Sequence, residues 1–326
     1  MSAGREALVG ELRGKLLAGL RPFAPAGSPY ALVDFPDHSN VGDSAIWLGQ
    51  LKMFDELVGR PPAYVSHRRN CDWEALAAVE GTIFIHGCGN FGDIYPAHQD
   101  FREEVLRRFP GRLVVQLPQS LHYGEPAGVR RTAEAIGAHG NFVLCVRDEN
   151  SRKLAEAFDC ATLLLPDSAF FLDLARSGPP KREVVYLHRT DSERVGEGVS
   201  SLPDGWAEVD WLDEPKRLTR RHERLAALRG LGLSPRAAVR EAAYRRAAQE
   251  RVGRGVRILS EGEMMVTDRL HAHILATLMD LPHLVLDNSY GKLSRYMAAW
   301  GTDRGSGRAV ESLQAAIEAW RRTRSA

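Results

Sequence analysis

The feature that most constrains the fold is an alternation of short apolar runs with longer segments of helical period, extending from Tyr30 to about Ser168. Short apolar runs indicate buried strands, and strands that alternate with helices indicate a mainly parallel sheet. Each run is followed closely by Gly, Pro, Asn or Asp, so loops lie at the carboxyl ends of the strands, where open α/β sheets bind ligands. The strands predicted here are 30–35, 82–86, 112–117, 141–146 and 161–165.

A second set of apolar runs begins after Ser177-Gly-Pro-Pro180, a segment whose composition is typical of a linker. A chain of 326 residues has room for two domains, since domains usually have about 100–200 residues. We therefore predict an α/β fold with two doubly wound halves, residues 1–178 and 179–326. The strands predicted in the second half are 183–188, 206–212, 263–267 and 282–287.

The end of the chain carries one more predicted helix, because apolar residues in 309–321 are spaced for one helix face. An apolar helix face must pack against another part of the protein. We expect the terminal helix to pack back across the first half.

The overall charge and cysteine content exclude several classes of protein. Lys and Arg number 43 against 42 Asp and Glu, so the net charge of +1 gives no whole-molecule attraction for nucleic acid or an anionic membrane. The four cysteines form no Cys-x-x-Cys pair, which favours a reducing compartment and argues against a zinc site. No apolar run approaches the ~18–20 residues of a membrane span, and the N-terminus does not resemble a signal peptide. We expect a cytoplasmic protein.

The segment 213–251 departs from this balance, with eleven Lys or Arg against five acids. Interleaved Leu and Ala predict two amphipathic helices, broken near 230–235. One interpretation is a solvated helical face whose Arg stems cover apolar surface. The other is peripheral contact of Lys216 to Arg251 with anionic lipid at the inner face of the cell membrane. Nucleic-acid binding is disfavoured, because Tyr244 is the one aromatic residue in the run.

The stretch 87–92 matches the Gly-x-Gly-x-x-Gly pattern of dinucleotide sites, but its context does not fit. Pro96 stands where the phosphate-binding helix should already be running, and no ribose-binding acid follows the next strand. The glycines instead predict a loop that a ligand approaches closely. This loop projects Asn90, Asp93 and His98 towards one edge of the sheet.

Two further strand exits carry charged side chains with two interpretations each. Asp43 opens a predicted helix, so it either caps that helix or places a carboxylate to bind or deprotonate a hydroxyl. Arg147 ends a strand, where its guanidinium either binds a carboxylate or phosphate or forms a salt bridge with Asp148 or Glu149.

The segment 266–273 runs from an apolar strand into a helix whose start holds Arg269 and His271. Helix N-termini bind anions, and an imidazole exchanges protons near neutral pH. His273 lies two residues after His271 and therefore on another helix face, which predicts a packed or capping side chain and not a metal pair. Two more polar clusters, 116–122 and 188–194, include His122 and Arg189 and are candidates for lining a cleft or for structural use.

Taken together, these motifs resemble the polysaccharide pyruvyl transferase family over about residues 30–300. The resemblance implies a fold similar to GT-B glycosyltransferases, with two Rossmann-like domains facing a cleft. It also implies transfer of pyruvate from phosphoenolpyruvate to two hydroxyls of a sugar as a ketal. The motifs that carry it are Asn40-Val-Gly-Asp43, Gly87-Cys-Gly-Asn-Phe-Gly-Asp93, Tyr95-Pro-Ala-His-Gln99, Gln116-Leu-Pro-Gln-Ser120, Val146-Arg-Asp-Glu-Asn-Ser151, Leu165-Pro-Asp167 and Thr267-Asp-Arg-Leu-His-Ala-His273.

The resemblance also assigns roles to particular residues. It implies phosphoenolpyruvate contacts for Arg147, Arg269 and Leu270, and proton transfer by His271. His98 or Asp43 is expected to orient or deprotonate the acceptor hydroxyls. Acceptor contacts are expected from Asn90, Asp93, His122 and Arg189. Cys88 departs from the family, which usually has a third glycine there, so the geometry of this loop is less constrained.

The expected chemistry requires no metal and no redox cofactor, with phosphoenolpyruvate as the donor substrate and a sugar or lipid-linked oligosaccharide as the acceptor. Two other functions fit the same residues. One is a glycosyltransferase that uses a nucleotide-sugar, since a fold does not fix a function. The other is a non-catalytic protein that binds sugar or a lipid surface. The sequence does not identify the acceptor sugar.

Overall fold

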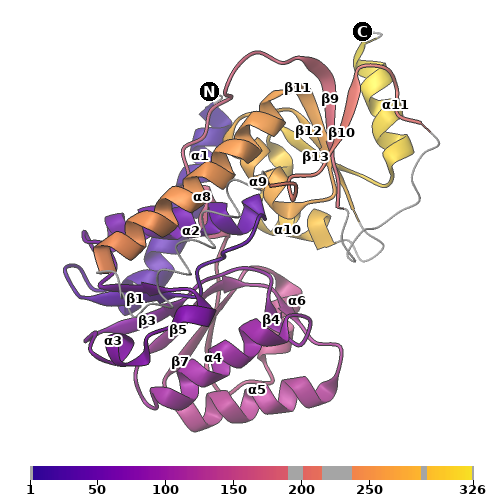
Figure 1. The fold of residues 1–326 in the computed structure, drawn as a ribbon. Coiled ribbons are helices and arrows are strands. Elements are labelled where there is room, and N and C mark those ends of the chain that lie inside the picture. Colours follow the sequence, from indigo (N-terminus) through magenta and orange to yellow (C-terminus); the bar gives the residue numbers. More distant parts are fainter. Residues whose placement is uncertain (1–2, 190–200, 215–236, 288–291, 325–326) are drawn as a thin grey trace.

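The computed structural model describes residues 3–189, 201–214, 237–287 and 292–324, and its core consists of two parallel sheets (Figure 1). The first sheet has the strand order β2-β1-β3-β5-β7-β8, and the second has the order β10-β9-β11-β12-β13. In the first sheet the strands are β1 (Tyr30–Val33), β2 (Tyr64–Ser66), β3 (Thr82–Ile85), β5 (Val114–Gln119), β7 (Phe142–Val146) and β8 (Ala161–Leu164). In the second they are β9 (Arg182–Leu187), β10 (Trp206–Val209), β11 (Gly262–Thr267), β12 (His283–Leu286) and β13 (Gly307–Val310).

Helices connect the strands, as parallel pairing requires. A short parallel pair, β4 (Phe91–Gly92) with β6 (Leu121–His122), forms beside the first sheet. The α-helices are α1 (Ala3–Leu20), α2 (Val41–Leu57), α3 (Trp73–Ala77), α4 (Pro96–Arg108), α5 (Pro126–His139), α6 (Glu149–Ala155), α8 (Ala237–Ser260), α9 (Leu270–Leu278), α10 (Lys292–Trp300) and α11 (Leu313–Arg324). The 3-10 helices are η1 (Arg21–Phe23), η2 (Arg68–Asn70), η3 (Ser168–Phe171) and η4 (Thr302–Arg304).

Two helices that follow strands of the first sheet, α2 and α6, begin at polar residues that cap them. Asn40 precedes α2, and its side-chain oxygen accepts from the backbone N–H of Gly42 at 3.1 Å. Asp148 precedes α6 and accepts from the backbone N–H of Ser151 at 2.8 Å. Such caps satisfy N–H groups that the first turn leaves without helical partners. They therefore fix where the chain turns at the carboxyl ends of the strands.

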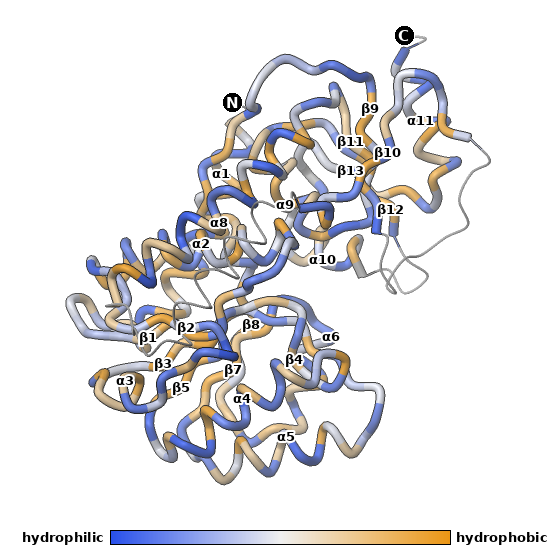
Figure 2. Tube along the Cα trace, viewed as in Figure 1, coloured by the Kyte–Doolittle hydropathy of each residue, from blue (hydrophilic) through white to orange (hydrophobic). Residues whose placement is uncertain are grey.

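The strands are mainly apolar, and Figure 2 shows them as orange stretches next to helices that carry both polar and apolar residues. Both faces of the first sheet are covered by apolar clusters, as a parallel sheet requires. A further cluster joins the two sheets: Leu12 of α1, Ile46 of α2 and Val252 of α8 are buried with Val185 of β9 and Leu275 of α9. Each such fully buried side chain contributes about 1.5–3 kcal/mol.

The predicted strands are confirmed with small changes at their ends, and the α/β class with parallel sheets is confirmed. Two strands of the large sheets were not predicted, nor was the short β4–β6 pair. β2 has three residues, and β13 contains the charged Arg308. The terminal helix begins at Leu313 rather than at 309.

The packing expected for the terminal helix was wrong. α11 lies on the second sheet, where Leu313 and Ile317 are buried with Val184, Val266 and Leu284. The reason is that β13, which directly precedes α11, belongs to the second sheet, and this sheet offers an apolar face close by. The chain therefore does not have to cross to the first sheet to bury the helix. The helix that reaches the first sheet is α8, which contacts α2 and β2.

The basic segment is described only in part, because 215–236 lies outside the described residues. Some arginines of α8 bind other parts of the protein. Arg240 donates to the Val65 carbonyl at 3.2 Å, and Arg251 donates to Glu214 Oε1 at 3.0 Å. Arg245 and Arg246 pair with glutamates of α8 itself. The predicted membrane contact of Lys216 to Arg251 stays a prediction.

None of the helices in the described ranges combines the length and the apolar composition that crossing a membrane needs.

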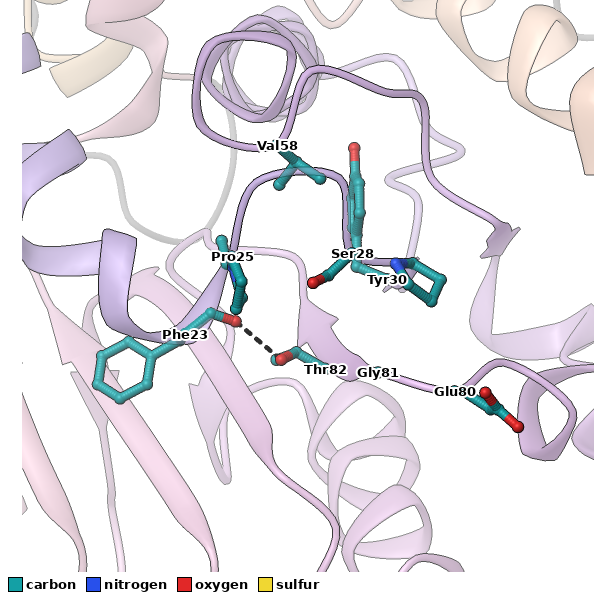
Figure 3. A pocket seen from close by; sticks show the side chains of 10 residues that line it. Phe23, Pro25, Ser28, Tyr30, Val58, Glu80, Gly81 and Thr82 are labelled. Carbon is teal, nitrogen blue, oxygen red and sulfur yellow. Dashed lines mark hydrogen bonds between the residues drawn. The ribbon is translucent and has the colours of Figure 1, made fainter.

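A small cavity of about 170 Å³ lies at the amino ends of β1 and β3, beside Tyr30 and Thr82 (Figure 3). Thr82 donates from Oγ1 to the Phe23 carbonyl at 2.8 Å, which ties the chain before β1 to the start of β3. The lining includes three prolines or alanines of the 24–29 segment and is mainly apolar. At the amino ends of these strands the side chains mainly pack against one another, whereas the polar residues of the predicted motifs lie at the carboxyl ends.

Candidate active site

A cavity of about 990 Å³ lies where loops from both sheets meet, beyond the carboxyl ends of their strands. Asp43, His98 and Arg147 line it from elements of the first sheet. Arg269 and His271 line it from the start of α9 in the second. The residues predicted from separate strand exits therefore share one cavity, at the place where open α/β sheets bind ligands.

In the wall of this cavity, Arg147 and His271 form a connected cluster with the buried Asp167. Arg147 Nη1 lies 2.6 Å from Asp167 Oδ2, and Arg147 Nε donates to Ser120 Oγ at 2.9 Å. His271 Nε2 lies 3.3 Å from Asp167 Oδ2 and 3.4 Å from Arg147 Nη1. Arg147 is thus paired with Asp167, and not with Asp148 or Glu149 as the structural interpretation expected.

Asp167 is ionised in this cluster. Burial alone would raise the pKa of its carboxyl, but the neighbouring His271 and Arg147 hold that pKa well below its usual range. Its carboxylate is fixed as well, since Oδ1 accepts from the backbone N–H of Ala169 at 2.9 Å. Asp167 therefore holds the guanidinium and the imidazole together.

His271 approaches the first turn of α2 closely because residue 42 is glycine. A Cβ on Gly42 would lie 2.5 Å from His271 Nδ1, far inside van der Waals contact. Gly89 acts similarly for Arg147, since a Cβ there would lie 3.3 Å from Arg147 Nη2. The glycines of the two motifs thus make room for the charged side chains of the site.

Arg269 is held beside the same cavity by the second sheet. It is the residue before α9, and its Nη2 donates to both carboxylate oxygens of Asp210, at 2.9 and 3.1 Å. The guanidinium also lies 5.9 Å from the ring centroid of Trp211. Leu270 follows it and lines the cavity, as does Arg189, whose backbone N–H donates to Asp268 at 3.0 Å.

Asp43 is not the cap of α2, because Asn40 fills that position. Its carboxylate accepts from Asn40 Nδ2 at 3.0 Å and from the Cys88 thiol at 3.1 Å, and it lies 3.4 Å from His38 Nε2. Burial would raise the pKa of Asp43, yet His38, His271 and the Cys88 thiol together lower it. Asp43 is an ionised group in the wall of the cavity.

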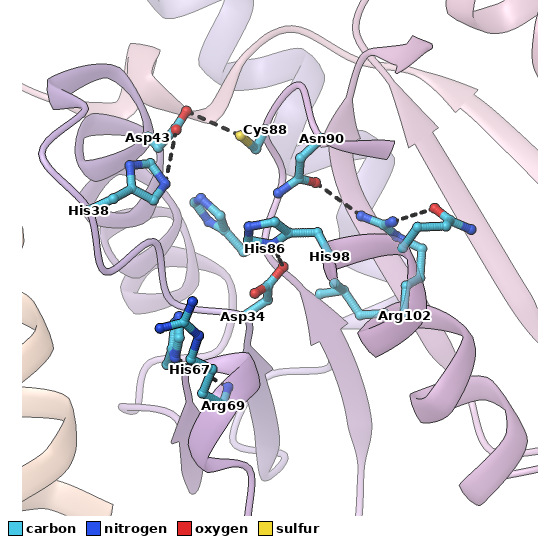
Figure 4. A network of polar contacts seen from close by, with 12 residues as sticks. Asp34, His38, Asp43, His67, Arg69, His86, Cys88, Asn90, His98 and Arg102 are labelled. Carbon is cyan, nitrogen blue, oxygen red and sulfur yellow. Dashed lines mark hydrogen bonds and ion pairs between the residues drawn. The ribbon is translucent and has the colours of Figure 1, made fainter. Parts of the chain in front are cut away.

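His98 lines the cavity from α4 and pairs with a residue that the motifs did not single out (Figure 4). His98 Nδ1 lies 2.8 Å from Oδ2 of Asp34, which follows β1. Figure 4 shows His38, His67 and His86 around this pair. Burial lowers the pKa of His67 and of His86 to about 4, so these imidazoles are neutral near pH 7.

Asn90 is fixed from beneath by a buried network. Its Oδ1 accepts from Arg102 Nη2 at 3.1 Å and from Gln119 Nε2 at 3.0 Å. His122 lines the cavity from β6. Asp93 differs, because its carboxylate accepts from the backbone N–H groups of Gly124 and Glu125 and so fixes the loop before α5. Its predicted contact with the acceptor stays a prediction.

His273 is a packed residue, as its position predicted. It is buried, with Nδ1 2.7 Å from His283 Nε2 and Nε2 2.8 Å from Thr302 Oγ1. Within the described part of the chain, no cluster of three or more His, Cys, Asp or Glu side chains has the geometry to hold a metal ion.

Three residues of the site were not predicted as site residues. Asp167 lay within a motif but had no assigned role, and Asp34 and His38 had neither a motif nor a role. The available signal was a position at or just beyond the end of a predicted strand, because ligands bind at the carboxyl ends of strands. Asp34 lay near the end of the predicted strand 30–35, His38 just after it, and Asp167 just after 161–165. Asp34 also carries a backbone signal that only the structure reveals, a φ of +68°.

The fold and the site together define an α/β protein that gathers arginines, histidines and carboxylates at one large cavity, an arrangement suited to a small polyanion. Residues 40–290 match the family described as polysaccharide pyruvyl transferase. The chain belongs to this family and is a transferase.

Two curated relatives agree with this result. "Pyruvyl transferase 1" of Schizosaccharomyces pombe (strain 972 / ATCC 24843) is 32% identical over 294 residues, which cover 83% of this chain and 69% of that protein. "Putative pyruvyl transferase EpsO" of Bacillus subtilis (strain 168) is 30% identical over 294 residues, covering 87% of this chain and 89% of that protein.

A solved structure shares the fold. The crystal structure of the uncharacterized protein KP1_0663 from Klebsiella pneumoniae matches with a TM-score of 0.57 over 92% of this chain and 99% of that chain. The sequence identity is 17%, so this likeness concerns the fold alone.

Proposed function

We propose that the protein transfers the pyruvyl unit of phosphoenolpyruvate to two hydroxyls of a sugar in a glycan or glycolipid, forming a pyruvate ketal and releasing phosphate. The observation that carries the proposal is the Arg147–Asp167–His271 cluster, in which a guanidinium and an imidazole meet in one cavity. A guanidinium binds carboxylate and phosphate oxygens, and an imidazole moves a proton near neutral pH.

The donor binds through cationic groups from both sheets in this proposal. Phosphoenolpyruvate carries up to about three negative charges, which two arginines and a helix N-terminus complement. Arg147 and Arg269 line the cavity, and α9 begins at Leu270, directly after Arg269. Each guanidinium is already oriented by a carboxylate, Asp167 or Asp210. The two arginine side chains therefore lose little conformational freedom when the donor binds.

The reaction begins with proton transfer to the donor. His271 gives a proton to the methylene carbon, and the electron pair of the C=C bond forms the new C–H bond. The oxygen of the first hydroxyl forms a bond to the electron-poor neighbouring carbon, and its proton passes to a base. The C–O bond to phosphate then breaks with its electron pair on phosphate, and the second hydroxyl takes its place. Of the two hydroxyl protons, one replaces the proton that His271 gave to the methyl group, and the other leaves with the phosphate.

We assign the proton transfer to His271 because its imidazole lies between two charged groups of the cluster. Its Nε2 is 3.3 Å from Asp167 Oδ2 and 3.4 Å from Arg147 Nη1. A donor that binds to the guanidinium of Arg147 would therefore lie beside this imidazole.

The acceptor side of the cavity is assigned mainly to elements of the first sheet. We assign acceptor contacts to Asn90, Asp93 and His122, and to Arg189, which follows β9 of the second sheet. His98 or Asp43 acts on the hydroxyls. The proposal needs no metal and no redox cofactor, because every step is a proton transfer or a substitution at carbon. We further propose that the two sheets are the centres of two Rossmann-like domains in a GT-B-like arrangement, with the boundary near residue 178.

The test is a product assay with purified protein, phosphoenolpyruvate and a panel of glycosides that includes lipid-linked sugars. We expect a product with the mass of one added pyruvyl group and release of phosphate in equal amount. Thermal shift supplies the comparison: phosphoenolpyruvate should stabilise the protein, and nucleotide-sugars should not. Stabilisation by a nucleotide-sugar with no pyruvyl product would favour the glycosyltransferase instead. Stabilisation by neither donor would favour a binding protein.

The cytoplasmic location and the peripheral membrane contact of the Lys216 to Arg251 segment also stay proposals. Sedimentation with liposomes that contain anionic lipid tests the contact, using charge reversal of Arg220, Arg221 and Arg224. The expected result is binding by the unaltered protein that the reversed variant loses.

A further inference from the structure

We propose that Asp34 is a positioning residue that makes His98 the base for an acceptor hydroxyl. The inference rests on the proposed function, since it names which group takes the hydroxyl proton. It assigns a role to a residue outside all the motifs of the sequence.

Asp34 occupies a backbone conformation that side chains seldom adopt. It directly follows β1, has a φ of +68°, and is 1% exposed. Within the described residues, Asp280 is the other non-glycine residue with a positive φ. Strained backbone positions of this kind cluster at functional sites, where the surrounding structure holds them. The turn aims the carboxylate at His98, which belongs to α4, 64 residues further along the chain.

The contact fixes the tautomer of His98. An ionised carboxylate accepts hydrogen bonds, so the 2.8 Å contact places the imidazole proton on Nδ1. The lone pair of a neutral ring then lies on Nε2. No protein group in the described ranges makes a hydrogen bond to Nε2, and His98 lines the cavity. A carboxylate that holds an imidazole in this way prepares its far nitrogen to accept a proton.

The surroundings keep Asp34 ionised. Burial would raise the pKa of its carboxyl, but the hydrogen bond and charge of His98, with contributions from His86 and Arg102, lower it. Asp34 Oδ1 is buried without a hydrogen-bond partner in the described structure, so His98 is the main group on which this carboxylate acts. His38 and His67 complete the set of titratable groups around the pair.

Asp43, the other candidate base, is less suited to the role. Three groups already face its carboxylate, namely Asn40 Nδ2, the Cys88 thiol and His38 Nε2. Hydrogen bonds to a carboxylate stabilise its charged form and weaken it as a proton acceptor. His98 has one ring nitrogen engaged and one facing the cavity, so the proton of the hydroxyl passes to His98 Nε2. The O–H bond breaks as the oxygen forms its bond to the pyruvyl carbon.

The test is Asp34→Asn. Asn tolerates positive φ as well as Asp does, so the backbone is retained while the charge is lost. We expect turnover to fall by about 10²- to 10³-fold, with the Michaelis constant and thermal shift for phosphoenolpyruvate little changed. Asp100→Asn is the matched control, because Asp100 lies on α4 two residues from His98 and pairs on the surface with Arg131. It should leave turnover within about twofold.

The second measurement is a double-mutant cycle with His98→Ala. If Asp34 acts through His98, Asp34→Asn has almost no further effect on turnover in the His98→Ala background. A merely structural role predicts equal losses in both backgrounds, and that result would overturn the proposal. Should Asp34→Asn fold poorly, Asp34→Gly accepts the same φ and gives the same prediction.

The outcome separates this inference from the proposed function. Absence of pyruvyl transfer by the unaltered protein would contradict the function. Transfer by the unaltered protein together with full turnover by Asp34→Asn would contradict only the role of Asp34. Loss of the phosphoenolpyruvate shift in Asp34→Asn would also contradict it, because the variant would then act on the donor side.

Discussion

Two histidine–aspartate pairs face the same cavity, and they are built differently. We call His271–Asp167 the donor-side pair and His98–Asp34 the acceptor-side pair. In the donor-side pair the contact is 3.3 Å, through Nε2, and the aspartate is shared with Arg147. In the acceptor-side pair the contact is 2.8 Å, through Nδ1. The carboxylate of Asp167 contacts both His271 and Arg147, whereas His98 is the main contact of the Asp34 carboxylate.

This difference suits different roles in proton transfer. Asp167 divides its contacts between Arg147 and His271, so a change at the guanidinium also affects the imidazole. Asp34 has no such competitor among its hydrogen bonds, so it holds His98 in one tautomer whether or not a donor is bound. The comparison predicts that the donor-side pair depends on Arg147 and that the acceptor-side pair is set before any donor binds.

The largest expected effect is that of His271→Ala. Removal of the proposed proton donor should lower turnover by about 10³- to 10⁴-fold, because no other group at this position protonates the methylene carbon. Steady-state phosphate release measures it. The loss of turnover in His98→Ala should be about one order of magnitude smaller than in His271→Ala. The reason is that a hydroxyl gives up its proton more easily while its oxygen bonds to an electron-poor carbon. Equal losses would remove the distinction between the two pairs.

Arg147→Ala should affect binding and folding together. The phosphoenolpyruvate thermal shift should vanish, and unfolding free energy should fall by about 3–5 kcal/mol, because Asp167 would be a buried charge without its cation. Urea unfolding and thermal shift measure the two effects. Arg131→Ala is the control, since that arginine is exposed. A retained phosphoenolpyruvate shift in Arg147→Ala would place the donor elsewhere.

Gly42→Ala tests whether the donor-side pair depends on close approach. The added methyl would lie 2.5 Å from His271 Nδ1 and must displace the ring. We expect turnover to fall by about 10²-fold, the order of loss that a small misplacement causes. Gly14→Ala in α1, where a Cβ meets no atom within 4 Å, should leave turnover unchanged. Full activity of Gly42→Ala would show that the position of His271 is not critical.

The smallest effect concerns acid stability on the acceptor side. Burial lowers the pKa of His86 from 6.5 to about 4. Below pH 6.5 the unfolded chain binds a proton there and the folded protein does not, so stability falls as the pH falls towards 4. The contribution of His86 between pH 6.5 and 5 is about 2 kcal/mol. His86→Gln should show a smaller loss of stability over this range in urea unfolding, and an unchanged loss would contradict the assignment.

Much of the fold was predictable because buried strands leave continuous apolar runs. β2 was not, since three residues form no such run, and β13 was not, because Arg308 interrupts it. Within the site, Arg147, Arg269 and His271 were predictable from their positions after strands. Their partners were not, because Asp167 meets His271 across 104 residues of sequence and Asp34 meets His98 across 64. Such pairings depend on how the elements pack, which no local pattern records.

The position of α8 limits how the chain can be cut or recombined. By sequence this helix belongs to the second half, yet Tyr244 stacks on Phe35 at 4.1 Å and Arg254 donates to the Ser39 carbonyl. A fragment ending at residue 178 would therefore expose the apolar side of α2, and a chimaera joined there would pair each first half with a foreign α8. Exchange of parts between relatives should move α8 together with the first sheet.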